Sequence, residues 1–298
     1  MSTLPLILNP TAGGGRCGPL AEQALGRLRR SGMTLELHTT TGPGHATTLA
    51  QQLIEAGHTT LLCAGGDGTA YELLNGVFPR DPHAPRPTLG LIPLGTGNSF
   101  LRDLGITTAE QSLDAILASR SQPVDVVKAT HTTGAIHYLN LLSIGFTSDV
   151  CTLTNRRFKP IGPAGYGVAT VIEIARLAPR ALPYACDDGP FDRDPLTFLS
   201  FSNSRCTAGT MQMAPDARIN DGQLDVIRVG AVTRLGLLRA FPRIYKGTHP
   251  TLPFVTTRTA RTVRFDLPGP IDVMVDGEVV PLHLTQLDVL PKAVEIFA

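Results

Sequence analysis

Short apolar runs alternate with helical patterns along residues 1–120 of the chain. The apolar runs predict four strands, at residues 4–9, 34–40, 60–64 and 89–93. Between them, apolar residues recur with helical spacing at residues 20–28 and 46–54. Such alternation indicates βα units that feed a parallel sheet, so we predict a three-layer α/β domain. Right-handed crossovers place all of its strand-to-helix loops at one edge of the sheet.

After Pro123 the pattern changes to short β-rich segments separated by Gly, Pro and Asp. We predict strands at residues 124–130, 136–144, 196–202, 224–229, 262–267 and 271–275. This texture is typical of an antiparallel sandwich or barrel. Helical patterns at residues 166–177 and 234–245 interrupt it, and we expect Pro242 to kink or end the second helix.

No repeat or long linker separates the two patterns, so we expect two domains that pack around a cleft. The first is an α/β nucleotide-binding domain at residues 1–122, and the second is a β-rich domain at residues 123–298. The last segment, residues 293–298, can return to either sheet.

Three glycine-rich loops each follow a predicted strand and precede a helix, at residues 9–15, 65–69 and 94–98. Glycine lets the backbone approach a bulky anion, and a helix N-terminus offers unpaired N–H groups. One such loop is usually only a tight turn, but three at one sheet edge favour a polyphosphate site. Asp67 in the second loop is placed to meet Mg²⁺ on bound phosphates. The chain has no G-x-x-x-x-G-K-[ST] motif, so the site is not a P-loop.

Charge and cysteine content narrow the possible partners. With 26 Lys+Arg against 25 Asp+Glu, the net charge of +1 gives no bulk field that would favour nucleic acid. Five widely spaced cysteines indicate neither a disulfide framework nor a zinc site and fit a reducing cytoplasm. No apolar run approaches the ~18 residues that span a bilayer. We therefore expect a cytoplasmic protein that reaches any lipid from the inner membrane face.

Six motifs stand in a specific order along the chain. They are NPTAGGG at residues 9–15, GGDGT at 65–69, PLGTGN at 93–98, APDA at 214–217, DG at 221–222 and DGE at 276–278. In this order they resemble the diacylglycerol kinase catalytic-domain family, which includes sphingosine and ceramide kinases and bacterial lipid kinases. GGDGT alone is shared with NAD kinases, whereas the combination is specific, and the resemblance runs nearly end to end.

The resemblance implies an ATP site and a lipid cleft against the β-rich domain. The implied nucleotide-binding residues are Asn9, Pro10, Thr11, Ala12, Gly13, Thr40, Gly66, Asp67, Gly68, Thr69, Ala70, Tyr71, Glu72 and Thr96. From sequence alone, Thr40 is equally well read as a helix-capping or turn threonine. Two positions depart from the family pattern, since Tyr71 stands where Asn is usual and Ser99 stands where Asp is usual. Ser99 removes a carboxylate from the cleft, so the charges there, and the choice of substrate, can differ from those of the family.

The acidic motifs of the second domain each have two readings. Taken alone, Asp276-Gly277-Glu278 is a turn with solvated acids. The resemblance makes Glu278 the candidate general base and Asp276 a neighbour that holds Mg²⁺ or orients the base. Similarly, Asp221-Gly222 is either an empty hairpin turn or a second Mg²⁺ site. The ligands that the resemblance implies there are Arg218 and Gln223, through their carbonyls, and Asp221.

Taken together, these features predict an ATP- and Mg²⁺-dependent kinase that phosphorylates a hydroxyl group of a membrane lipid. The rivals are an NAD kinase-like enzyme and a non-catalytic nucleotide-sensing protein. The sequence names neither the lipid nor the oligomeric state, and a homodimer is among the alternatives. Arg234, Arg239, Arg243 and Lys246 alternate with Leu235 and Leu238, which fits either anionic headgroups or, more commonly, a solvated basic face.

Overall fold

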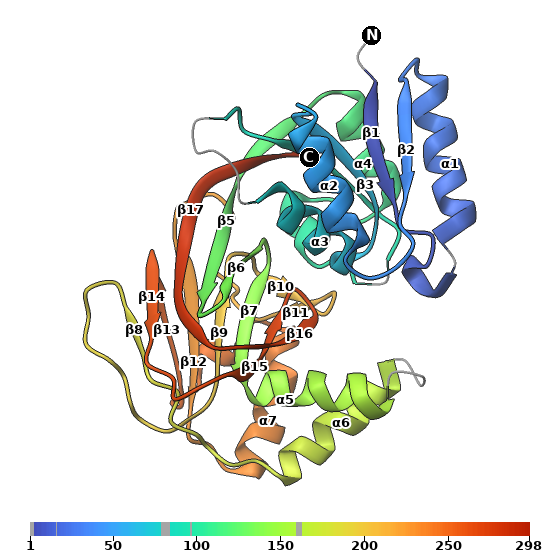
Figure 1. Cartoon of the computed structure of the whole chain (residues 1–298). Coiled ribbons are helices and arrows are strands. Elements are labelled where there is room, and N and C mark those ends of the chain that lie inside the picture. Colours follow the sequence, from blue (N-terminus) through green and yellow to red (C-terminus); the bar gives the residue numbers. More distant parts are fainter. Residues whose placement is uncertain (1–2, 16, 79–83, 96, 159–162) are drawn as a thin grey trace. The chain divides into compact units, whose positions relative to one another are not determined.

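The computed structural model describes residues 3–15, 17–78, 84–95, 97–158 and 163–298 (Figure 1). The chain divides into two units, Met1–Val126 with Leu290–Ala298, and Val127–Val289. The long strand β17 (Leu284–Phe297) contributes its last residues to the first unit and its first residues to the second. None of the helices in the described ranges is long and apolar enough to cross a membrane.

The first unit is a parallel sheet with helices on both faces. Its strands are β1 (Leu4–Leu8), β2 (Leu35–Thr39), β3 (Thr60–Gly65) and β4 (Thr88–Pro93), in the order β2-β1-β3-β4, and the end of β17 pairs parallel with β4. Its helices are α1 (Cys17–Arg30), α2 (His45–Glu55), α3 (Asp67–Val77) and α4 (Ala109–Leu117). Leu25 and Leu28 of α1 and Leu113 and Ile116 of α4 share one buried cluster with the sheet, while α2 and α3 pack on each other. The predicted three-layer α/β domain is therefore confirmed.

The second unit contains two antiparallel β-layers. One layer is a six-stranded sheet with the order β13-β12-β9-β7-β15-β16. In the other layer, β14 lies between β17 and β8, and β5 pairs with both β17 and β6. Their bounds are β5 (Ser121–His131), β6 (Gly134–Tyr138), β7 (Leu141–Gly145), β8 (Tyr184–Cys186), β9 (Leu196–Ser202), β12 (Leu224–Gly230), β13 (Val255–Ala260), β14 (Thr262–Phe265), β15 (Ile271–Val275) and β16 (Glu278–Leu282). The first part of β5, up to Val126, belongs to the first unit. A small pair, β10 (Cys206–Thr207) and β11 (Met211–Gln212), stands apart. Phe201 of β9 makes edge-to-face contacts with Tyr184 and Phe265, which joins the two layers and confirms the β-rich prediction.

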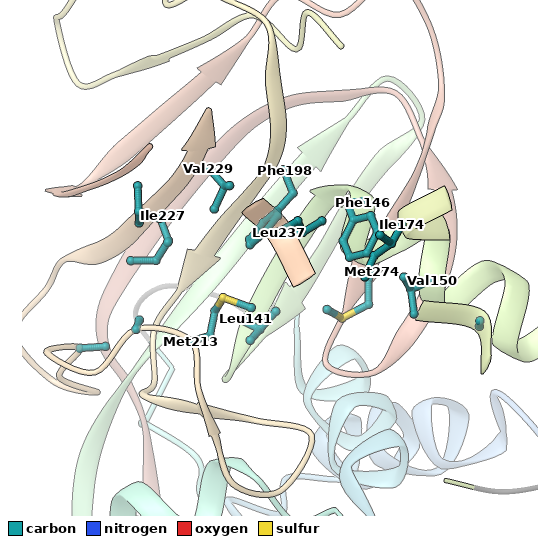
Figure 2. Close-up of a cluster of buried hydrophobic side chains, with 14 residues drawn as sticks. Leu141, Phe146, Val150, Ile174, Phe198, Met213, Ile227, Val229, Leu237 and Met274 are labelled. Carbon is teal, nitrogen blue, oxygen red and sulfur yellow. The ribbon is translucent and has the colours of Figure 1, made fainter. Parts of the chain in front are cut away.

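Three helices cover the outer face of the six-stranded sheet. They are α5 (Phe146–Leu153), α6 (Pro163–Ala175) and α7 (Arg234–Tyr245). Phe146, Ile174 and Leu237, one from each helix, lie in a buried cluster with Phe198 and Ile227 of the sheet (Figure 2). Burial of this shared cluster fixes the helices on the sheet, because each side chain would otherwise remain exposed to water.

The structure corrects two sequence predictions in this unit. The segment 136–144, predicted as one strand, is two strands in different sheets. Strand β6 ends at Tyr138 and pairs with β5, whereas β7 begins at Leu141 and pairs with β9 and β15. Pro242, expected to kink or end the helix, does not end α7, which continues to Tyr245; the kink stays a prediction. Proline fixes φ at a helical value, so in the last turn it removes one N–H without stopping the helix.

Candidate active site

The three glycine-rich loops meet at one edge of the parallel sheet. They follow β1, β3 and β4, which are neighbouring parallel strands, so their carboxyl ends lie side by side. The backbones of the second and third loops nearly touch: a Cβ on Gly95 would lie 2.6 Å from the Cα of Gly66. Gly13 of the first loop, at φ +61°, would carry its Cβ 2.8 Å from the carbonyl oxygen of Leu94. Contact between the loops therefore requires glycine at these positions, before any ligand is considered.

Asp67 is the first residue of α3 and lies between the second and third loops. Its Oδ2 is 3.4 Å from the backbone nitrogen of Ser99, and a Cβ on Gly97 would lie 2.5 Å from the same oxygen. Desolvation by burial raises the pKa of Asp67, and the N–H groups of Ser99 and Asn98 only partly offset this. A desolvated carboxylate at the edge of three loops is a suitable ligand for a hard divalent cation. The residues present therefore fit the metal that the sequence predicts.

Hydrogen bonds tie the first loop to the second. The Asn9 side chain donates to Thr69 Oγ1 at 3.0 Å, and Asn9 Oδ1 accepts from both the backbone and the hydroxyl group of Thr11. Thr40, directly after β2, is buried, and its N–H donates to the carbonyl of Leu8. Asn9, Thr69 and Thr40 thus lie at the sheet edge where the sequence analysis expects a nucleotide.

The remaining predicted nucleotide residues have varied surroundings. Glu72 accepts the N–H groups of Gly44 (2.8 Å) and Ala46 (3.1 Å), so its carboxylate caps the start of α2. Tyr71 is partly buried, and its carbonyl accepts from the Asn75 side chain. Partly buried Gly66, Gly68 and Ala70 lie at or near the start of α3, whereas Pro10 and Ala12 belong to the first loop. Thr96 lies outside the described residues. The nucleotide contacts of all these residues stay predictions.

In the second unit, Asp276 and Gly277 form the two-residue turn between β15 and β16. Their φ values of +46° and +94° are those of a type I′ turn. The carboxylate of Asp276 accepts three backbone N–H groups, from Leu139 (3.1 Å), Asn140 (3.1 Å) and Leu141 (3.0 Å). Asp276 therefore holds the β6–β7 turn against this hairpin.

Glu278 is the first residue of β16, directly after the turn, and its cross-strand partner is Val275. Its side chain is exposed. Within the described ranges, the Glu278 carboxylate has no hydrogen-bond or ion-pair partner. It is thus free to accept a proton, whereas the Asp276 carboxylate is already engaged.

The predicted second cation site lies in the loop before β12. Asp221 Oδ1 accepts the N–H of Gln223 at 3.0 Å, and Arg218 is exposed. Burial, with the nearby charges of Asp221 and Asp216, raises the pKa of Asp225 to about 6. No group of three His, Cys, Asp or Glu side chains in the described ranges is arranged to hold a metal ion. The predicted set relies on one carboxylate and two carbonyls, so it stays a prediction.

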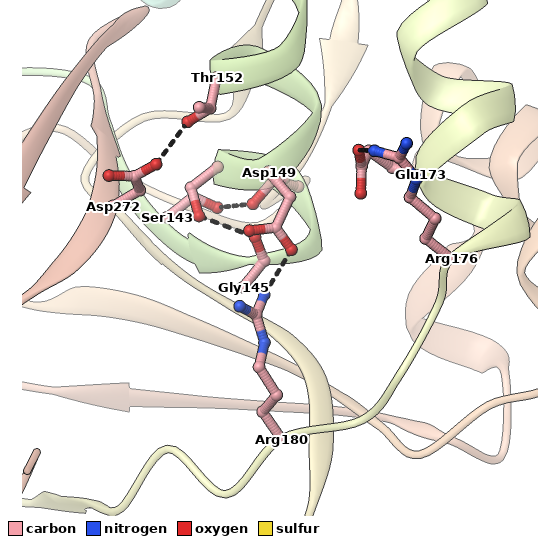
Figure 3. Close-up of polar contacts among 10 residues, drawn as sticks. Ser143, Gly145, Asp149, Thr152, Glu173, Arg176, Arg180 and Asp272 are labelled. Atoms are coloured by element: carbon pink, nitrogen blue, oxygen red, sulfur yellow. Dashed lines mark hydrogen bonds and ion pairs between the residues drawn. The ribbon is translucent and has the colours of Figure 1, made fainter.

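A polar network that the sequence does not predict lies beside α5. Asp149 pairs with Arg180, Glu173 pairs with Arg176 at 3.3 Å, and Thr152 donates to Asp272 at 2.9 Å (Figure 3). Burial raises the pKa of Asp149, and Arg180 partly offsets this. The lining residues of an adjacent cavity of about 150 Å³ are Phe146, Asp149, Glu173, Arg176, Leu177, Ala178, Arg180 and Thr197. The only sequence signal for this network is the group of polar residues, Thr147 to Asp149, that follows an apolar strand.

Comparison with known proteins places the chain in a family. Residues 3–129 match the family described as the diacylglycerol kinase catalytic domain, and residues 140–298 match the YegS C-terminal NAD kinase beta sandwich-like domain. The chain is 29% identical over 294 residues to the diacylglycerol kinase of Mycobacterium tuberculosis strain H37Rv, covering 97% of this chain and 93% of that protein.

Further relatives are similar to this chain over nearly its whole length. The diacylglycerol kinase of Staphylococcus saprophyticus is 30% identical over 276 residues, covering 92% of this chain and 88% of that protein. The crystal structure of a candidate diacylglycerol kinase from Bacillus anthracis strain Sterne superimposes with a TM-score of 0.81 at 25% identity, covering 99% and 94% of the two chains. The resemblance predicted from the motifs is thereby confirmed, and the chain belongs to the diacylglycerol kinase family of kinases.

Proposed function

We propose that this kinase transfers the γ-phosphoryl group of ATP, bound with Mg²⁺, to a hydroxyl group of a membrane lipid. The observation that carries the proposal is the position of Asp67, a desolvated carboxylate between two glycine loops at a helix N-terminus. Phosphoryl transfer depends mainly on positioning and on neutralising phosphate charge, and this edge of the sheet supplies the groups for both.

On the donor side, the backbone N–H groups of the three loops and the start of α3 would hold the polyphosphate. The Asn9–Thr69 hydrogen bond keeps the first two loops together, so that their N–H groups converge. Asp67 would ligate Mg²⁺, which supplies charge neutralisation on the phosphate oxygens when bound. By the family resemblance, Thr96 and Gly68 would also contact the nucleotide.

On the acceptor side, Glu278 would take the proton of the lipid hydroxyl as the phosphoryl group arrives. Its carboxylate is exposed and has no partner among the described residues, as a general base requires. Asp276 would act as a positioning residue, because three N–H groups hold its carboxylate and its turn fixes the start of β16. A second Mg²⁺ in the Asp221 loop would relieve the repulsion that Asp225 experiences there.

The cavity beside α5 is our candidate for the polar head of the lipid. Phe146 of its lining belongs to the hydrophobic cluster of Figure 2 and Leu177 packs against that cluster, so these two side chains would offer apolar contacts to the start of a lipid tail. Asp149 and Glu173 provide acceptors for hydroxyl groups, and each is paired with an arginine that offsets part of its charge. Because the relatives are named diacylglycerol kinases, diacylglycerol is the first acceptor to test.

The test is incubation of purified protein with γ-labelled ATP, Mg²⁺ and total lipid extract, followed by identification of the labelled species. We expect a labelled lipid with the parent protein and a much lower rate of labelling with Asp67→Asn. NAD in a parallel reaction checks the NAD kinase reading, since labelled NADP would replace the proposal. Nucleotide binding without turnover on any acceptor would instead indicate a sensing protein.

A further inference from the structure

The outward face of α7 combines exposed apolar and basic side chains. Leu237 and Ala240 are buried and face the protein. Leu235 (54% exposed), Leu238 (52%) and Tyr245 (50%) lie on the opposite face, three and seven positions apart, which is one stripe of a helix. Large apolar side chains on a solvent-facing stripe need a partner to cover them.

Basic residues flank this apolar stripe. Arg234, Arg239, Arg243 and Lys246 are all exposed, and residues 234–246 contain no acidic residue. None of these four cations forms an ion pair within the part of the chain that the structure describes. Since the whole chain carries a net charge of only +1, four unpaired cations along one helix are a local concentration of charge.

Helix α6 extends the apolar surface. Val168 (42% exposed) and Val171 (64%) point away from the protein, while Ala169 and Ile174 lie in the same buried cluster as Leu237 of α7. The two helices pack on each other, as Figure 1 shows in the lower part of the second unit. Five of the seven exposed large hydrophobic residues in the described ranges belong to these two helices, so exposure is concentrated here.

Helix α7 is also formed before any partner binds. Thr233 caps it, with the hydroxyl accepting the N–H of Gly236 at 3.1 Å. Its inner face is held by the hydrophobic cluster, so docking requires no coupled folding of the helix. A preformed helix loses less conformational entropy on binding than a segment that must fold.

From this pattern we infer that α7, with α6 beside it, docks on an anionic lipid bilayer. In this arrangement α7 lies in the plane of the interface, with Leu235, Leu238 and Tyr245 entering the headgroup region and the basic residues against anionic headgroups. A bilayer fits both features at once, because it offers apolar depth and diffuse negative charge along the helix. The inference rests on the proposed function, since a kinase acting on membrane lipid must reach its substrate at the surface.

Vesicle flotation without nucleotide tests the docking separately from catalysis. We expect the full-length protein to bind vesicles of phosphatidylglycerol and phosphatidylcholine, to bind pure phosphatidylcholine weakly, and to dissociate as salt increases. The charge variant Arg234→Gln/Arg239→Gln/Lys246→Gln should lower the partition coefficient about 100-fold, from a loss of roughly 5-fold for each of three cations. The apolar variant Leu235→Ser/Leu238→Ser should lower partitioning at every salt concentration.

A matched control comes from the first unit. Leu20→Ser/Leu37→Ser removes two leucines of similar exposure, 47% and 41%, and should leave vesicle binding unchanged. Equal loss of binding in the control and the α7 variants would overturn the inference, as would unchanged binding in both α7 variants. A change of oligomeric state in the α7 variants, seen by sedimentation without vesicles, would overturn it in favour of an interface between copies.

Phosphorylation of a dispersed short-chain diacylglycerol separates this inference from the proposed function. We expect the α7 variants to keep this activity while losing activity on vesicles. If the parent protein binds anionic vesicles but phosphorylates no acceptor, the proposed function fails and the docking stands. If it phosphorylates the dispersed acceptor but its vesicle binding is insensitive to the α7 variants, only the docking fails.

Discussion

Asp67 and Asp276 are both aspartates beside a glycine at the end of a strand, yet the protein satisfies their carboxylates differently. Asp276 accepts three backbone N–H groups at 3.0 to 3.1 Å. The Asp67 carboxylate receives the backbone N–H groups of Ser99, at a long 3.4 Å, and of Asn98, which only partly offset the rise in its pKa from burial. From this difference in how well each carboxylate is satisfied, we propose that Asp276 is a structural anchor and that Asp67 is a ligand for a cation.

The same comparison separates Glu278 from Asp276 within one hairpin. Asp276 lies in the turn and binds the neighbouring chain, whereas Glu278 begins the next strand with an exposed carboxylate. We therefore propose that Asp276 holds the hairpin and that Glu278 meets the substrate. Five experiments can break or sharpen this division.

Glu278→Gln should give the largest effect. The change keeps the shape of the side chain and removes its basicity, so kcat should fall about 10²- to 10⁴-fold while the Kd for ATP stays unchanged. Because the side chain is exposed, stability should change by less than about 0.5 kcal/mol. Steady-state kinetics on the lipid acceptor and nucleotide titration measure the two quantities. A kcat within a few-fold of the parent would move the base elsewhere.

Asp67→Asn should lower kcat about 10²- to 10³-fold, because the cation loses a ligand that neutralises charge in the transition state. Stability should respond in the opposite direction when no cation is present. Burial raises the pKa of Asp67, so the folded protein holds this proton above the pH at which the unfolded chain releases it. The ionised group then destabilises the fold as pH rises, and asparagine removes that cost.

Thermal unfolding near neutral pH checks this second effect. Without divalent cation, the Asp67→Asn variant should melt at or above the temperature of the parent. Added Mg²⁺ with ATP should raise the melting temperature of the parent and not that of the variant. If the variant melts well below the parent without cation, Asp67 is a structural residue like Asp276.

Asp276→Asn tests the anchor. Asparagine tolerates φ of +46°, but it offers one acceptor oxygen in place of two, so at least one of the three N–H groups loses its partner. Each unsatisfied buried group costs about 1–3 kcal/mol, which denaturant unfolding measures. As a positioning residue, Asp276 should also influence kcat, and the pH dependence of the remaining activity should keep the midpoint of the parent. If Asp276→Asn lost activity with an unchanged free energy of unfolding, Asp276 would instead be a catalytic residue.

The sequence predicts the parallel strands well and the turn between β6 and β7 poorly, for a physical reason. Buried parallel strands are largely continuous apolar runs, as in β3 and β4, so local pattern is sufficient. The turn at Leu139 and Asn140 is hidden within an apolar run, and the residue that fixes it, Asp276, lies far away in the chain. The Asp149–Arg180 pair likewise joins residues 31 positions apart. Long-range polar contacts of this kind leave little local signal.

The glycine-loop contact offers a smaller test on the Asp67 side. Gly95→Ala would place a Cβ 2.6 Å from the Cα of Gly66, so the two loops must separate, at a cost of about 1–3 kcal/mol. We expect a lower melting temperature and weaker ATP binding. Gly42→Ala is the matched control, because a Cβ there meets no atom within 4 Å. Equal behaviour of the two variants would show that the loops do not depend on this contact.

The Asp221 loop should give the smallest effect and can show whether an acidic turn binds a cation. Burial, Asp221 and Asp216 raise the pKa of Asp225 to about 6 from the model-compound value of 3.8. Between these pH values the folded state holds a proton that the unfolded chain has released, so this group's contribution to stability falls as pH rises towards neutrality. Asp221→Asn removes one repulsive charge and should raise the melting temperature at pH 7 without divalent cation. With Mg²⁺ the parent should have the higher melting temperature, because only the parent keeps the carboxylate ligand.

The control is Asp188→Asn, at an exposed turn of the same unit, which should show neither change in melting temperature. If Mg²⁺ leaves the difference in melting temperature between the parent and Asp221→Asn unchanged, the loop is an empty turn that binds no cation.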